Sequence, residues 1–181
     1  MSLIALSSTV ARLVAGAASD FLAPPAPLAH LPPLAPPPRK RLHCSRIALM
    51  FGFAATMFGG FALVAAGAVH ARPDLFWLVS TSVGAGYGAV FCLAPTVVSV
   101  VWGTRNFGTN WGIVTMTPAL GAVVYGCVFA REYDAHAGAG GMCAGPACVS
   151  SSFAAMAASV VAAVVGWAWV WRKWRVRGVA V

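Results

Sequence analysis

Two long apolar stretches, residues 75–102 and 111–131, dominate the sequence and are separated by a short polar turn at 103–110. A helix needs about 20 residues to cross the hydrocarbon layer of a bilayer, because it rises about 1.5 Å per residue. Both stretches exceed that length, and neither contains an ionised side chain before Arg131. Their glycines and prolines are tolerated in membranes, where small residues also let helices pack closely. The pair predicts a helical hairpin inside a polytopic membrane protein.

Composition supports the same class for the whole chain of 181 residues. Apolar residues make up 60% of it, charged residues only 9%, and the mean hydropathy is +0.80. A soluble domain has about 25% charged residues. Transmembrane β-strands would alternate apolar and polar residues over about ten positions, and the sequence shows no such pattern. We therefore predict an all-α bundle of transmembrane helices.

Five apolar spans are expected along the chain, and two polar segments separate some of them. A Pro-rich linker at 24–46 follows the first span, and a Gly-rich loop at 132–152 precedes the last. Proline lacks an N–H group and disfavours helix in the residue before it, so the linker is not expected to be helical. The predicted spans are 2–23, 47–69, 75–102, 111–131 and 153–171.

The net charge of +8 is distributed in a way that indicates membrane topology and not nucleic-acid binding. Five spans place the linker, the 103–110 turn and the C-terminal tail on one side, with nine basic residues, and the other two connections on the opposite side, with two. Because basic loops stay in the cytosol, the first side is predicted to be cytosolic. The nine are Arg39, Lys40, Arg41, Arg46, Arg105, Arg172, Lys173, Arg175 and Arg177.

Cys143 and Cys148 then lie in the non-cytosolic loop, where thiols can be oxidised. The four residues between them include Gly145 and Pro146, which suit a small closed ring. A disulfide and a pair of free thiols are both open, and the disulfide is favoured. Two cysteines with only His136 nearby do not make a metal site.

The sequence contains no nucleophile–base pair, no paired carboxylates and no metal-ligand spacing, so we predict neither an enzyme nor a cofactor. Arg12 is the one charge near the middle of a span. An arginine at that depth costs several kcal/mol unless it faces a partner or water. It therefore either serves a functional site or pairs only to hold the bundle together.

Two further groups of residues have both a functional and a structural interpretation. Tyr87 and Tyr125 lie within spans and either line a cavity or pack with a satisfied hydroxyl group. Arg105, Asn106 and Asn110 occupy the predicted cytosolic turn. They either make gate contacts or serve turn geometry, with an asparagine capping the next helix, and the second role is favoured.

Two sets of motifs resemble a known family. Gly16-x-x-Ser19-Asp20 followed by Arg39–Arg41 is similar to a loop motif of the major facilitator superfamily, although the proline run interrupts it. Further motifs resemble the nodulin-like, monocarboxylate-transporter-homologue branch of that superfamily. In order these are Gly84-x-Gly-Tyr-Gly88, Pro95, Trp102-Gly103, Asn106-Phe-Gly-Thr-Asn-Trp-Gly112, Pro118, Tyr133-Asp134 and Cys143-x-Gly-x-x-Cys148 before Phe153.

This resemblance implies a function and a location. The spans would correspond to helices 8 to 12 of a twelve-helix fold that moves a small solute by alternating access between two halves. Arg12 would attract an anionic substrate, and Asp20, Arg39 and Arg41 would contribute to a cytosolic gate. Fungal members of the branch are assigned to the vacuolar membrane, and the plasma membrane is the alternative.

The same mapping leaves the whole N-terminal half and helix 7 outside the chain. Three interpretations follow from it. The chain is part of a transporter, with the missing half as its partner; it is a small membrane scaffold or accessory subunit that binds another membrane protein; or it is a non-functional remnant. In each case the lipid bilayer is its immediate surroundings.

Overall fold

The computed structural model describes residues 2–22, 45–137, 143 and 145–176. Within these ranges it is helical and contains no strand, and five helices are long and apolar enough to cross a membrane. The predicted all-α transmembrane bundle is therefore confirmed. The α-helices are α1 (Ser2–Leu22), α2 (Arg46–Ala65), α3 (Ala68–Ala71), α4 (Phe76–Trp102), α5 (Phe107–His136) and α6 (Ser150–Val176). Three short 3-10 helices are η1 (Pro73–Leu75), η2 (Thr104–Asn106) and η3 (Pro146–Cys148).

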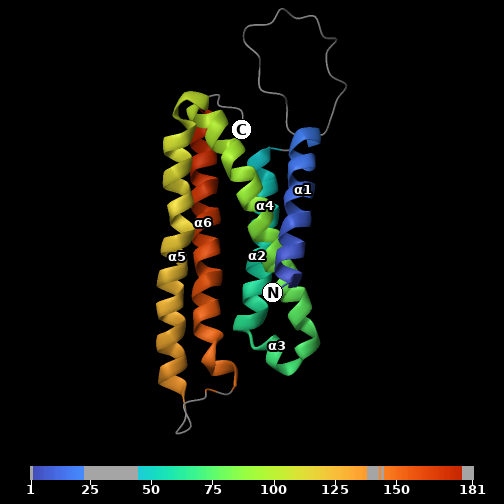
Figure 1. The fold of residues 1–181 in the computed structure, drawn as a ribbon, viewed down its shortest axis with the longest axis vertical. Coiled ribbons are helices and arrows are strands. Elements are labelled where there is room, and N and C mark those ends of the chain that lie inside the picture. The colour runs from blue at the N-terminus through green and yellow to red at the C-terminus, as the bar shows by residue number, and fades with distance from the viewer. Residues whose placement is uncertain (1, 23–44, 138–142, 144, 177–181) are drawn as a thin grey trace, which may run out of the picture.

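Helix α4 lies between α1 and α2 and packs closely against both (Figure 1). Gly84 and Gly88, one helical turn apart, face α1, where any side chain would collide with the backbone of Ile4 and Ser8. Gly86 faces α2 instead, and a Cβ there would lie 2.7 Å from the carbonyl oxygen of Phe53. Small residues allow this approach, which gives membrane helices their packing contacts. A core of Ala11, Ala15, Met50, Ala89, Leu93 and Val97 fills the contact.

The span predicted over residues 47–69 is divided in the structure. Helix α2 ends at Ala65, and the short helix α3 begins only at Ala68. Gly67 between them has a φ of 71°, in the left-handed region that glycine adopts without steric cost. The sequence predicted one span over 47–69, and this glycine accounts for the difference.

Helices α5 and α6 form a second pair beside the first three helices (Figure 1). Helix α6 packs on α2, and the rings of Phe51 and Phe61 in α2 contact Trp167 and Phe153 of α6. Helix α5 lies further out, and its only buried residue is Glu132. It continues to His136, whereas the sequence placed the start of a loop at 132.

The two ends of the bundle differ in charge. The end of α1, the start of α2, the α4–α5 turn and the end of α6 lie at one end (Figure 1). That end carries Arg46, Arg105, Arg172 and Lys173 among the described residues. Arg72 and Arg131 lie at the opposite end. That the more basic end faces the cytosol stays a prediction.

Candidate functional site

Arg12 lies halfway along α1 and its side chain is exposed. Its neighbour Ala11 is buried against α4, so Arg12 is rotated off the contact with that helix. The backbone carbonyl of Arg12 accepts a hydrogen bond from Cys92 Sγ of α4 at 3.3 Å. Within the described part of the chain, its guanidinium has no hydrogen-bond or ion-pair partner. The structure thus presents a single unneutralised charge in the middle of an apolar helix.

The two tyrosines lie on different helices from Arg12. Tyr87 of α4 is 44% exposed, and its ring lies 4.6 Å from the ring of Phe91, centroid to centroid. Tyr125 is half-buried on α5. No hydrogen bond or ring contact joins Arg12, Tyr87 and Tyr125 in the described ranges. A shared substrate site therefore stays a prediction for these three residues.

The predicted gate residues that the structure describes are spread over one end of the bundle. Asp20 is exposed near the end of α1, Arg105 and Asn106 are exposed in η2, and Arg39 and Arg41 lie outside the described residues. Asn110 Nδ2 donates a hydrogen bond to the carbonyl oxygen of Asn106, at 3.0 Å, one turn earlier in the chain. Asn106 holds the N-cap position of α5, but its side chain makes no capping hydrogen bond. The contact seen here is local to the turn.

A polar contact at the same end was not foreseen from the sequence. Arg46 Nε, at the start of α2, donates a hydrogen bond of 3.2 Å to Ser19 Oγ near the end of α1. Ser19 is buried and precedes Asp20 in the motif that resembles the superfamily loop. The bond joins the two helices that flank the proline-rich linker.

The opposite end holds a buried carboxylate, the clearest polar arrangement in the described residues. Glu132 of α5 is 9% exposed and accepts hydrogen bonds from the first turn of α6. The amide of Ser151 donates to Oε1 at 2.9 Å and that of Ser152 to Oε2 at 2.7 Å, and both hydroxyl groups donate to the same oxygens. We call this arrangement the Glu132 clamp. It satisfies N–H groups that a helix start leaves free, and it places a negative charge at the positive end of the helix dipole.

Cross-links around the clamp hold the connection from α5 to α6. Cys143 and Cys148 form a disulfide with their Cα atoms 6.0 Å apart. The amide of Cys143 donates a hydrogen bond to Tyr133 Oη at 3.3 Å, and Ser150 Oγ donates one to the carbonyl of Ala65 in α2 at 2.6 Å. The start of α6 is therefore bound to α5 and to α2. The one sequence signal near this contact is the run Ser150–Ser152 before an apolar stretch, because serine is common where a helix begins.

An apolar hollow of about 410 Å³ lies between α1 and α4. Its walls are aliphatic and hydroxyl side chains and carry no charge, so it suits an apolar helix or an acyl chain and not an anion. The lining residues are Leu3, Leu6, Ser7, Val10, Ala11, Val14, Thr81 and Ala85.

Comparison with known proteins gives matches along the whole chain. It is 41% identical over its full length to a protein of Neurospora crassa named probable transporter mch1, covering 33% of that protein. It is also 41% identical to the probable transporter mch1 of Aspergillus fumigatus, and 33% identical to the probable transporter MCH1 of Saccharomyces cerevisiae. The chain spans about a third of the length of these curated relatives.

No protein-family model matches the chain. No solved structure matches it either. The placement rests on relatives from several fungi that match 97% to 100% of this chain. It agrees with the resemblance that the glycine and asparagine motifs indicated. By these matches the chain belongs to the family of fungal monocarboxylate-transporter homologues named probable transporter MCH1.

Proposed function

We propose that the chain is the C-terminal part of a major facilitator transporter that carries a small anionic solute by alternating access. The relatives are named probable transporters, and the chain matches about a third of each. The resemblance of its motifs to the last helices of the superfamily supports the same assignment. The vacuolar membrane is the proposed location, with the plasma membrane as the alternative.

Arg12 is the observation that carries this proposal. Its side chain is exposed at the centre of a membrane-spanning helix and has no partner in the described ranges. Exposing a guanidinium group to lipid at that depth would cost several kcal/mol, so the charge needs water or an anion beside it. A water-filled path between two helical halves would supply the water and would also admit an anionic solute. A guanidinium group binds a carboxylate through charge-assisted hydrogen bonds.

The other helices of a longer protein would complete this path. Helix α5 has almost no buried residue, and the hollow between α1 and α4 is open and apolar. Both surfaces suit contact with further transmembrane helices. Tyr87 and Tyr125 are proposed to line the path, and Asp20, Arg39, Arg41, Arg105, Asn106 and Asn110 to contribute to its cytosolic gate.

Transport assays on the longer protein test the role of Arg12. Vesicles containing the protein encoded by the full transcript are assayed for uptake of a panel of small labelled carboxylates. Replacing Arg12→Gln should raise the half-saturating concentration about 10- to 100-fold, because a hydrogen bond to a charged group is lost. Arg12→Lys should retain part of the affinity, and Arg72→Gln at the bundle end is the matched control. Unchanged uptake by the Arg12→Gln protein would contradict the proposal.

The chain of 181 residues on its own provides a second test. Half of a transport path leaves polar groups without an opposing wall, so vesicles with this chain alone should show no uptake. Uptake by them would refute the two-part pathway. A stable 18.6 kDa product that co-purifies with another membrane protein would favour the scaffold or accessory subunit instead.

A further inference from the structure

The last turns of α6 have two distinct faces. Trp167 and Trp174 point inward, because their rings contact Phe51 of α2 and Trp102 of α4. Trp171 also contacts Phe51 and lies at the border between the two faces. On the outward face four apolar side chains are 46% to 85% exposed. Together with Arg172 they recur every three or four positions along the helix. The exposed apolar residues are Val161, Val165, Trp169 and Val176. Arg172 continues this row in the gap before Val176.

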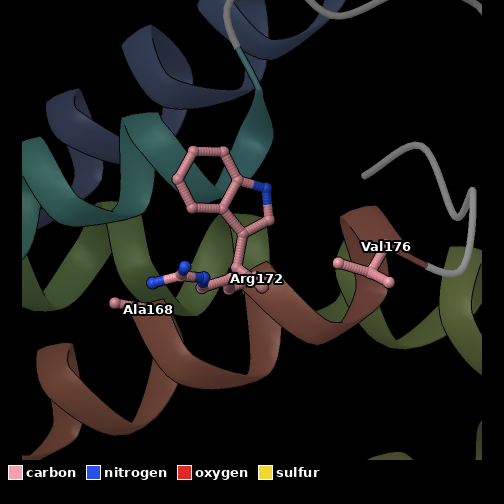
Figure 2. A pocket seen from close by; sticks show the side chains of 4 residues that line it. Ala168, Arg172 and Val176 are labelled. Atoms are coloured by element: carbon pink, nitrogen blue, oxygen red, sulfur yellow. The ribbon is translucent and has the colours of Figure 1, made fainter.

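A shallow groove runs along the outward face at the level of Arg172. One part of it, of about 540 Å³, is lined by Ala168, Trp171, Arg172 and Val176. An adjoining part, of about 480 Å³, shares Arg172 and Val176 and adds Trp169 and Lys173. Figure 2 shows Arg172 with its guanidinium extending back along the helix toward Ala168. We call these six residues the α6 groove. It joins an apolar wall to two cationic groups.

The position of the groove along α6 matches the boundary of a bilayer. About 20 helical residues cross the hydrocarbon layer. Counted from Ser152, which is buried in the Glu132 clamp at the other end, this length reaches Arg172. Lys173 Nζ also lies 3.7 Å from the centroid of the Trp169 ring, a cation–π contact. Tryptophan and basic residues gather where hydrocarbon meets lipid headgroups.

The charges around the groove select an anion. Neither Arg172 nor Lys173 contacts a carboxylate among the described residues, and Arg105 lies at the same end of the bundle. The acidic residue at this end is Asp20, exposed on α1. The other three acidic residues of the chain, Asp74, Glu132 and Asp134, lie at the opposite end. A ligand that fits must carry negative charge at one end and apolar chains at the other.

We propose that the α6 groove binds an anionic glycerophospholipid of the adjacent leaflet. Its phosphate contacts Arg172 and Lys173, and an acyl chain lies along Val165 and Val161. Basic residues at a membrane surface each strengthen binding of anionic lipid about fivefold. The site is separate from Arg12 and does not depend on transport activity.

Lipid titrations of the full chain in detergent, followed by native mass spectrometry, test this site. Phosphatidylserine is the anionic probe and phosphatidylcholine the neutral one. The unaltered chain should retain phosphatidylserine at least tenfold more tightly than phosphatidylcholine. The double variant Arg172→Gln/Lys173→Gln should lower that affinity about 20-fold, whereas Arg72→Gln, which also removes a basic charge, should leave it unchanged.

Each outcome of this experiment decides something. Equal retention of the two lipids by the unaltered chain would overturn the proposal, whatever the variants do. So would equal loss in the Arg72→Gln control, since it would indicate a general charge effect. Millimolar glycerophosphoserine, which lacks acyl chains, should fail to displace the lipid. Displacement would show that the groove recognises a soluble phosphate and that the proposed lipid is wrong.

Discussion

The two parts of the bundle are held together by different means. In the unit of α1, α2 and α4, nine residues of α4 are buried, and glycines bring its backbone against both neighbours. In the pair of α5 and α6, Glu132 is the one buried residue of α5, and the Glu132 clamp joins the helices at one end. The first part is thus joined along its length and the second by a polar contact at its end. Contact along a helix fixes position and angle together, whereas a contact at one end fixes only position.

Of the substitutions that test this difference between the two parts, a bulky residue at Gly88 should lower the free energy of unfolding most. Gly88→Leu places a side chain into the carbonyl oxygen of Ser8, so α1 must move away from α4. Because backbone cannot yield as a flexible side chain does, we expect a loss of about 3 kcal/mol in the free energy of unfolding. Thermal unfolding in detergent measures it.

Gly112→Leu on α5 is the matched control for that change. Nothing lies within 4 Å of a Cβ placed at Gly112, so the variant should unfold like the unaltered chain. Equal destabilisation by the two substitutions would mean that α5 is packed as closely as α4, and the contrast would fail.

Loss of the Glu132 clamp should have a smaller and local effect. Glu132→Gln keeps the size of the side chain but removes its charge, and an amide group cannot accept at both of its ends. Hydrogen exchange at the amides of Ser151 and Ser152 should become several-fold faster, while the amides of α4 should keep their protection. Asp134→Asn is the control, because Asp134 is exposed and its side chain makes no hydrogen bond or ion pair in the described ranges. Faster exchange throughout α4 would show that the two parts unfold as one.

The smallest effect is expected at the bond between α1 and α2. Ser19→Ala removes the acceptor of the 3.2 Å hydrogen bond from Arg46. A hydrogen bond of this kind contributes about 1 kcal/mol, and Arg46 can turn toward water when its partner is lost. Urea unfolding in detergent, compared with Ser2→Ala at the exposed start of α1, measures the difference. If Ser19→Ala lowered the free energy of unfolding as much as Gly88→Leu does, this bond would hold the first three helices together as much as the packing at the α4 glycines.

The sequence predicted the features that depend on composition and on spacing within one helix. Apolar length predicted the five spanning helices, and the glycines of residues 75–102 were expected to let helices pack closely. Which helix each glycine contacts could not be predicted, because spacing shows that Gly84 and Gly88 share a face but not what lies opposite. The Glu132 clamp was missed for a similar reason. It depends on the contact between α5 and the start of α6, and the sequence placed position 132 only at the start of a loop at 132–152.

For the candidate site, too, the sequence indicated single residues but not the contacts between helices. Arg12 was found because a charge in an apolar helix is visible in the sequence. The Arg46–Ser19 bond was not, since it joins residues on either side of the proline-rich linker. Arg12, Tyr87 and Tyr125 lie on α1, α4 and α5, and the contacts that would join them at one site belong to tertiary structure.

The central place of α4 has a consequence for biosynthesis. Helices α1 and α2 leave the ribosome before α4, yet they touch each other little and both pack mainly on α4. The ribosome must therefore translate through Trp102 before the three-helix unit can close. Until then the two earlier helices need shelter, from the insertion machinery or from another helix, and a nascent chain halted ahead of α4 would be a substrate for membrane quality control.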